Sequence, residues 1–338
     1  MPARRSCLVA PDSFKGTFTA AQVAAAIGRG LEAAGEPLPD LCPVADGGEG
    51  TLSVLLTALG GETRGALVSG PLGRPVMAGY ALVEDGGTAI VEVAGASGMG
   101  LVEEDERGPQ SAWDASTRGT GELIAAAARS GAAVVLVAAG GSATTDGGAG
   151  AIAAIREAGG LGGAALVVLC DVRTPYEDAA CVFAPQKGAD PATVARLQAR
   201  LHDHAATLSR DPRGRPMGGA AGGLAGGLWA ACGASLQGGA PFVLDAVGFD
   251  ERLRDAHAVI LGEGRLDEQT LHGKILGEAA ARARRAGIPV HAIVGQDALS
   301  PERRRTLGLA TVREAGTLEA IEWQARALAL HDLRPHTP

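Results

Sequence analysis

The chain has 338 residues, of which 46% are hydrophobic and 20% charged, so it can bury a sizeable core and does not belong to the disordered class. Its formal net charge of −8 argues against a broad nucleic-acid or anionic-membrane surface, and an aromatic content of 3% leaves little for base stacking. A length of this order predicts two domains of ordinary size or one large domain.

The N-terminal region does not have the pattern of a targeting segment. The basic start, residues 1–5, precedes an apolar run that spans only residues 7–10, which is too short for the core of a signal peptide. No apolar stretch reaches the ~18 residues of a membrane span. The five cysteines are dispersed and include no C-x-x-C pair. These features predict a globular cytoplasmic protein with reduced thiols and with neither a nucleic-acid nor a membrane partner.

Short apolar runs alternate with helical patterns along the chain. Val23, Ile27 and Leu31 repeat at helical spacing behind a capping box formed by Thr19 and Gln22, and further helices are predicted over residues 52–59 and after residue 191. The apolar runs, which predict buried strands, are residues 8–10, 41–45, 89–94, 134–139, 165–170, 258–261 and 290–294. This alternation predicts an α/β architecture with a parallel sheet, and residues 71–75 and 210–227 indicate breaks in it.

Acidic residues follow several of the predicted strands. One or two acids beside glycines would be ordinary turn chemistry, but six are a functional signal, because ligands of parallel α/β sheets bind beyond the carboxyl ends of the strands. The six are Asp12, Asp46, Asp146, Asp171, Glu263 and Asp267.

Several common chemistries are excluded by their motifs. Residues 160–165 match G-x-G-x-x-A but follow a predicted helix and precede a strand, which is the wrong order for a dinucleotide fingerprint. Neither a Walker A loop nor a G-x-S-x-G elbow occurs. His202 and His204 lie two apart on a predicted helix, so we expect them in solvent and expect no zinc site.

Phosphoryl transfer is the chemistry that remains. It depends on positioning and charge neutralisation, which carboxylates with Mg²⁺, lysines and glycine amides at helix N-termini supply. Residues 46–51 and 141–148 are glycine-rich segments that each open a predicted helix. The chain has only three lysines, Lys15, Lys187 and Lys274, and each adjoins a glycine. Composition alone leaves two equal interpretations of them, a codon bias toward arginine and phosphate binding.

These segments resemble motifs of the bacterial type-1 glycerate kinase family, in the family's order and over almost the whole chain. The resemblance implies a kinase that uses ATP and Mg²⁺ to phosphorylate D-glycerate. The matching segments are residues 10–16 (APDSFKG), 45–51 (ADGGEGT), 119–124 (GTGELI), 140–148 (GGSATTDGG), 170–172 (CDV), 185–189 (PQKGA), 219–224 (GAAGGL), 262–267 (GEGRLD) and 273–274 (GK).

The resemblance also implies the domain organisation. It predicts a Rossmann-like parallel-sheet domain from residues 1–70 and 241–338, a second α/β domain inserted as residues 71–240, and an active site in the interdomain cleft. The chain departs from the family pattern at residues 159–163, where a segment of about thirty residues is missing, which shortens the inserted domain. Thr145, Thr174, Arg118 and Leu276 are further departures from the usual residues.

Roles for individual residues follow from the same resemblance. The predicted catalytic residues are Lys15, Asp46, Asp171, Asp267 and Lys274, with Asp171 and Asp267 also the predicted Mg²⁺ ligands. The predicted substrate-binding residues are Ser13, Glu263 and Arg265. The predicted nucleotide and phosphate ligands are Gly47, Gly48, Gly141, Ser142, Gly147, Gly148 and Lys187.

The resemblance favours 2-phosphoglycerate as the product, with 3-phosphoglycerate as the alternative. A kinase for another small hydroxy acid and a catalytically idle ligand-binding regulator on the same fold stay open as other functions. A homodimer is a possible assembly.

Overall fold

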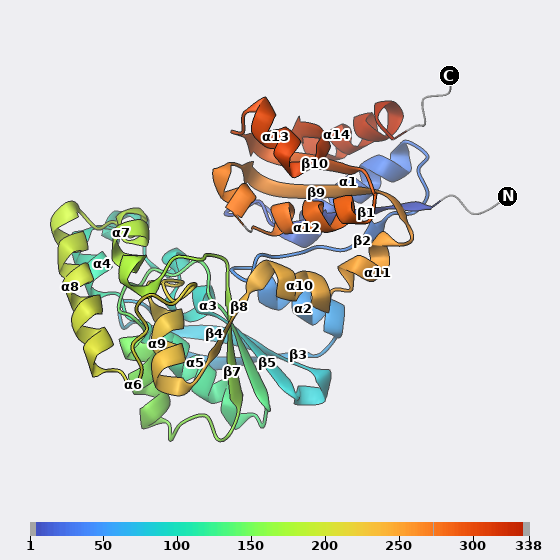
Figure 1. The fold of residues 1–338 in the computed structure, drawn as a ribbon. Helices are drawn as coiled ribbons and strands as arrows, with labels where there is room; N and C mark the ends of the chain where they lie inside the picture. The colour runs from blue at the N-terminus through green and yellow to red at the C-terminus, as the bar shows by residue number, and fades with distance from the viewer. Residues whose placement is uncertain (1–4, 273, 334–338) are drawn as a thin grey trace. The chain divides into compact units, whose positions relative to one another are not determined.

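The computed structural model describes residues 5–272 and 274–333, and the chain divides into two compact units (Figure 1). Unit 1 comprises residues 1–46 and 240–338, and unit 2 comprises residues 47–239. We placed the first domain boundary at residue 70, whereas residues 47–70 belong to unit 2, where their strand pairs with the sheet of that unit. Among the described residues, no helix is both long and apolar enough to cross a membrane.

Unit 1 is built on a five-stranded parallel sheet in the order β11-β10-β9-β1-β2. Helices α1 and α14 pack against each other on one face of the sheet, and α12 packs against β9 and β10 (Figure 1). The strands are β1 (Ser6–Pro11), β2 (Asp40–Leu41), β9 (Ala256–Leu266), β10 (Val290–Asp297) and β11 (Leu309–Glu314). The helices are α1 (Ala20–Ala33), α10 (Gly239–Ala246), α11 (Phe249–Leu253), α12 (Ile275–Arg285), α13 (Pro301–Leu307) and α14 (Leu318–His331).

The strand order of unit 1 fixes where a ligand can bind. Counted within the unit, the order is 2-1-3-4-5, the flavodoxin-like variant of a doubly wound sheet. The predicted parallel α/β domain is therefore present, with this order in place of the Rossmann order. The chain turns in opposite directions after β1 and after β9, and ligands bind where the direction reverses. Asp12, directly after β1, and Glu263, near the end of β9, lie at this point.

Unit 2 contains a six-stranded mixed sheet in the order β3-β4-β5-β6-β7-β8, in which β3, β4 and β5 are antiparallel and the rest parallel. The strands are β3 (Glu62–Ser69), β4 (Pro75–Val83), β5 (Thr88–Glu92), β6 (Val134–Ala138), β7 (Ala165–Cys170) and β8 (Ser235–Gly238). The helices are α2 (Thr51–Leu59), α3 (Val93–Ser97), α4 (Pro109–Asp114), α5 (Arg118–Arg129), α6 (Ala149–Glu157), α7 (Ala179–Phe183), α8 (Pro191–Thr207) and α9 (Leu224–Cys232).

Most of the predicted elements are present. The capping box of α1 is confirmed, with Gln22 N donating to Thr19 Oγ1 at 3.2 Å and Thr19 N donating to Gln22 Oε1 at 2.9 Å. The apolar run at residues 41–45 forms only the two-residue strand β2, although Cys42 N and Val44 N beyond it still donate to Val9 O and Pro11 O of β1 at 2.8 and 3.0 Å. The break predicted at residues 71–75 is the turn of the β3–β4 hairpin.

Candidate active site

A cavity of about 370 Å³ lies in unit 1 at the carboxyl ends of β1 and β9. Many of the residues predicted for substrate binding and catalysis line it, namely Ser13, Lys15, Asp46, Glu263, Arg265 and Lys274, together with Asp12 and Gln296. Four of these come from the first 46 residues and four from beyond residue 262, so the parallel pairing of β1 with β9 and of β9 with β10 brings them together. The sequence motifs at residues 10–16 and 262–267 therefore form one site within one unit.

Lys15 and two carboxylates form one wall of this cavity. Lys15 Nζ donates to Asp46 Oδ2 at 3.0 Å, and its side chain is 54% exposed, whereas that of Asp46 is 4% exposed. Asp12 is buried, and its Oδ1 accepts a hydrogen bond from Ser13 N at 2.6 Å. Burial, together with the negative charges of Asp46 and Glu263, raises the pKa of Asp12 to about 8, although Lys15 and the Ser13 amide act in the opposite direction.

The other wall carries Glu263 and the cations that follow it. Thr270 Oγ1 donates to Glu263 Oε1 at 2.7 Å, and burial raises the pKa of Glu263 to about 7 despite that hydrogen bond and nearby Lys274. Asp267 lies 3.8 Å from Lys274 Nζ and 3.6 Å from Arg265 Nε. The Arg265 side chain is 60% exposed, so its guanidinium is accessible to an anion from solvent. Gly273, the first residue of the last motif, lies outside the described residues.

Two glycines let the strands converge beneath the cavity. A Cβ atom on Gly295 would lie 2.4 Å from the carbonyl oxygen of Gly264, and one on Gly264 would lie 3.3 Å from the Cα of Phe14. A side chain at Gly295 would therefore force β9 and β10 apart. With glycine there, β9 stays paired with β10 as far as Leu266, beyond the end of its apolar run at residue 261, and Glu263 lies within the strand.

A second cavity, of about 300 Å³, lies in unit 2 and contains four of the predicted residues: Gly141, Ser142, Asp171 and Lys187. Lys187 is buried, and its Nζ donates to the carbonyl oxygen of Thr144 at 2.5 Å. Burial lowers the pKa of Lys187 to about 8, against the opposing charges of Asp146 and Asp171. A buried ammonium group beside a carboxylate and a glycine loop is suited to a phosphate ligand.

The loop on the other side of this cavity is held by its own hydroxyl groups. Ser142 Oγ accepts a hydrogen bond from Thr144 N at 3.0 Å and lies 2.8 Å from Thr144 Oγ1. Gly141 has a φ of +67°, a conformation that favours glycine, and its carbonyl accepts from Met99 N at 2.9 Å. The backbone is thus fixed before any ligand binds.

The remaining predicted glycines do not line either cavity. The Gly147 amide donates to Gly222 O at 3.1 Å and the Gly148 amide to Asp146 Oδ1 at 3.1 Å, so neither is directed at a ligand. A Cβ atom on Gly147 would lie 2.1 Å from the Tyr176 hydroxyl, which accounts for glycine there. Asp146, one of the six acids, instead accepts from Gly150 N in the first turn of α6 at 3.2 Å and from Thr117 N and Oγ1, both at 2.9 Å.

The N-terminus of α2 already binds a carboxylate of the protein itself. Leu52 N donates to Glu92 Oε1 at 2.8 Å, so a carboxylate of the protein itself lies at the N-terminus of this helix. Gly47 packs against the backbone of Gly239, where a Cβ atom would lie 2.6 Å from the Gly239 Cα. Gly48 packs against Gly140 in the same way, because a Cβ atom on Gly140 would lie 2.5 Å from the Gly48 Cα. These glycines therefore have a packing role in unit 2.

Three residues of the unit 1 site, Asp12, Thr270 and Gln296, were given no individual role in the sequence analysis. Asp12 was noted only as an acid after a strand, although its position directly after β1, one residue before Ser13, was a signal for a site residue. Thr270 and Gln296 had no sequence signal. His204, which we expected in solvent, is half-buried, and burial lowers its pKa.

Comparisons with known proteins identify the family of the chain. The model of the glycerate kinase family matches residues 7–159 and 156–328. The chain belongs to the glycerate kinase family. The two matched segments meet at residues 156–159, beside the connection between α6 and β7 where we predicted a shortening relative to the family. That shortening stays a prediction.

Relatives in this family match most of the chain. It is 38% identical over 327 residues to a glycerate 2-kinase of Escherichia coli K12, with 85% of this chain and 84% of the relative covered. It is 40% identical over 329 residues to a glycerate kinase of Bacillus subtilis 168, with the same coverage. A crystal structure of a protein assigned as glycerate kinase 2 from Salmonella typhimurium LT2 superimposes with a TM-score of 0.79 at 34% identity, covering 96% of this chain and 97% of that one.

Proposed function

We propose that this glycerate kinase family member transfers the γ-phosphoryl group of ATP to D-glycerate and that the product is 2-phosphoglycerate. The observation that supports it most is the unit 1 cavity, where Lys15, Lys274 and Arg265 lie among buried carboxylates. Cations of this kind neutralise the charge of a small carboxylate substrate and of a transferring phosphoryl group. The name of the Escherichia coli relative favours the 2-position.

Binding of glycerate is assigned to the exposed side of the unit 1 cavity. The guanidinium of Arg265 forms a bidentate pair with the glycerate carboxylate, and Ser13 and Glu263 hydrogen-bond to its hydroxyl groups. Asp267, which lies close to both Arg265 and Lys274, holds these two cations in position. Because Asp267 already faces two cations, we propose this positioning role for it in place of metal coordination.

Transfer requires that the attacking hydroxyl lose its proton to a nearby base. Asp12 is the proposed acceptor in its ionised form: its raised pKa of about 8 makes that form a stronger base than an ordinary carboxylate, and the form predominates only above pH 8. Lys15, paired with Asp46, is positioned to contact the transferring phosphoryl oxygens, and Lys274 supplies a second positive charge. Asp46 keeps the Lys15 ammonium in place and limits its rotamers.

The unit 2 cavity is the proposed site for the nucleotide phosphates. Lys187 neutralises phosphate charge, and Gly141 and Ser142 provide the loop against which the phosphates lie. Mg²⁺ is bound by one or two carboxylates together with phosphate oxygens, and the carboxylate of Asp171 beside this loop fits that requirement. When bound, Mg²⁺ reduces the negative charge of the phosphates. The proposed phosphate ligands do not include Gly47 and Gly48, which pack closely against other glycines, or Gly147 and Gly148, whose amides donate within unit 2.

The proposal is tested by ADP release from purified protein with ATP and Mg²⁺, comparing D-glycerate with L-glycerate, glycolate and no acceptor. The product is then passed to enolase with and without phosphoglycerate mutase. D-glycerate-dependent ADP release with enolase turnover in the absence of mutase is the expected result. A requirement for mutase would show 3-phosphoglycerate instead.

The Lys15→Ala variant tests the site itself, with Arg29→Ala as the control. Arg29 is an exposed cation of unit 1 that pairs with Glu322 at 2.7 Å, away from the cavity lining. We expect Lys15→Ala to lower kcat by at least about 100-fold, the scale of one lost transition-state contact, and Arg29→Ala to leave it unchanged. Wild-type protein that binds ATP but releases no ADP with any acceptor would support the regulator alternative.

A further inference from the structure

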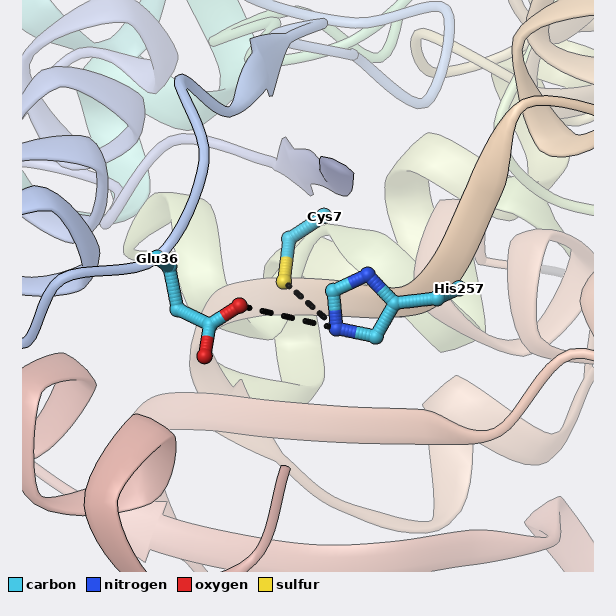
Figure 2. A group of neighbouring side chains, drawn as sticks. All are labelled: Cys7, Glu36 and His257. Atoms are coloured by element: carbon cyan, nitrogen blue, oxygen red, sulfur yellow. Dashed lines mark hydrogen bonds and ion pairs between the residues drawn. The ribbon is translucent and has the colours of Figure 1, made fainter. Parts of the chain in front are cut away.

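Cys7, Glu36 and His257 converge in unit 1, at the opposite end of the sheet from the cavity (Figure 2). Cys7 is in β1, Glu36 follows α1, and His257 is at the start of β9. One ligand atom from each, a thiol sulfur, a carboxylate oxygen and an imidazole nitrogen, lies within 4.8 Å of the other two. His257 Nε2 is 3.6 Å from Cys7 Sγ and 3.8 Å from Glu36 Oε2.

The backbone orients His257 toward the other two side chains. Ser6 pairs with Ala256 but Cys7 pairs with Ala258, so the register shifts and His257 is the extra residue on β9. Such irregularities redirect a side chain. Its Nδ1 lies 2.8 Å from Arg5 O and 3.1 Å from Ser6 O, and carbonyls only accept, so Nδ1 carries the hydrogen. The lone pair of Nε2 therefore faces Cys7 and Glu36.

We propose that Cys7, Glu36 and His257 bind a Zn²⁺ ion, with water as the fourth ligand. Zinc bonds of about 2.0–2.3 Å in a tetrahedral site place neighbouring ligand atoms about 3.3–3.8 Å apart, close to the separations seen here. Metal-bound histidines usually donate their other ring N–H to a carbonyl or carboxylate, as His257 does. On binding, the Cys7 thiol releases its proton and the thiolate sulfur bonds to the metal.

Burial and donor type both favour zinc over the hard cations. Cys7 is fully buried and the Glu36 side chain is 4% exposed, whereas the His257 side chain is 25% exposed, which leaves one side accessible to the ion and to water. Mixed sulfur, nitrogen and oxygen donors suit Zn²⁺, whereas Mg²⁺ takes oxygen ligands. The site was outside our sequence-based expectation, which considered only His202 and His204.

The test measures metal content of purified full-length protein after exposure to Zn²⁺ and extensive dialysis. We expect about one Zn²⁺ per chain in the wild type and a loss of at least tenfold in affinity in Cys7→Ala and His257→Gln. Cys181→Ser and His202→Gln are the matched controls, because these residues are exposed and lie in unit 2. Replacement by Co²⁺ should produce a sulfur-to-metal charge-transfer band that is absent in Cys7→Ala.

Binding should also raise the melting temperature of the wild type and not that of His257→Gln, because a ligand of the folded state alone stabilises it. His257→Gln keeps the β1–β9 pairing and is partly exposed, so circular dichroism should show it folded. Its kinase activity should equal that of the wild type, because the proposed catalytic residues line the cavity elsewhere. Equal metal content in His257→Gln and wild type, or no Zn²⁺ in the wild type above that in the two variants, would overturn the proposal.

Discussion

Replacing Asp12 by asparagine is expected to stabilise unit 1 while it removes catalysis. Asp12 is 5% exposed, and burial with nearby negative charge raises the pKa of its carboxyl from 3.8 to about 8. Between these two values the folded state retains a proton that the unfolded state has lost. The free energy of unfolding therefore falls as the pH rises through this window, and below 3.8 the group is protonated in both states and imposes no cost.

The size of the effect follows from the same shift. One pKa unit corresponds to about 1.4 kcal/mol, so at pH 7 the raised pKa of Asp12 costs the folded protein about 4 kcal/mol as an upper bound. Asparagine keeps the Oδ1 that accepts from Ser13 N at 2.6 Å but adds an amide that needs its own partners. We therefore expect Asp12→Asn to be more stable by about 1–3 kcal/mol at pH 7–8, with kcat lowered at least about 100-fold.

The assay is urea unfolding followed by circular dichroism at pH 6, 7 and 8, in EDTA and without nucleotide. The stability difference between Asp12→Asn and wild type should grow with pH, by up to about 1.4 kcal/mol per unit, at an unchanged dependence on urea concentration. Asp203→Asn, on the exposed side of α8, controls for the loss of one negative charge. An Asp12→Asn protein that is no more stable at pH 8 than wild type would refute the burial argument, and one that retains full kcat would refute the catalytic role.

Three further predictions concern single contacts. Glu92→Ala should destabilise unit 2 by about 1–3 kcal/mol, because the Leu52 amide at the start of α2 loses the carboxylate that accepts its hydrogen bond at 2.8 Å. Urea unfolding measures this loss of stability, and an unchanged unfolding midpoint would contradict the prediction. Lys187→Arg should weaken ATP binding at least about tenfold, as measured by calorimetry. A guanidinium would bring five N–H donors to a buried position where Lys187 now donates to the Thr144 carbonyl. An unchanged affinity for ATP would contradict this role of Lys187. Arg265→Lys should raise the KM for D-glycerate about 10-fold with little change in kcat, because a lysine cannot bind the carboxylate in a bidentate manner. A variant in which only kcat changes would exclude a role of Arg265 in binding the glycerate carboxylate.

The strands that the sequence could predict are those buried in parallel sheets. Their apolar runs are nearly continuous, as in β6 and β7, and need no partner to be recognised. The hairpin of β3 and β4 escaped prediction because β3 is mostly exposed and has polar residues at its start, so it shows neither a continuous run nor a clear alternation. The edge strand β11 has no fully buried residue and was missed for the same reason.

The composition of the unit 1 cavity was more predictable than the roles of its residues. Motifs with charged residues beside glycines identified Lys15, Glu263 and Arg265, because close strand ends need glycine and ligand binding needs charge. The direction of the backbone amides was not predictable from the sequence. The Gly147 amide donates to the carbonyl of Gly222, which is far away in the sequence, and the Gly148 amide donates to the side chain of Asp146. The N-terminus of α2, which the sequence predicted as a phosphate site, instead binds the carboxylate of Glu92.

The lysines give the clearest link between composition and site. The sequence left open whether three lysines among twenty-seven arginines reflected codon bias or phosphate binding. All three line a described cavity, Lys15 and Lys274 in unit 1 and Lys187 in unit 2. Arginines outside these two cavities have other roles that suit a planar guanidinium: Arg29 forms a surface ion pair, Arg196 stacks on Trp113, and Arg284 donates to the Thr306 carbonyl. A compact ammonium with rotatable donors suits a cavity wall, as where Lys187 donates to the Thr144 carbonyl. Codon bias alone would scatter the surviving lysines over the surface, so their positions favour the phosphate-binding interpretation.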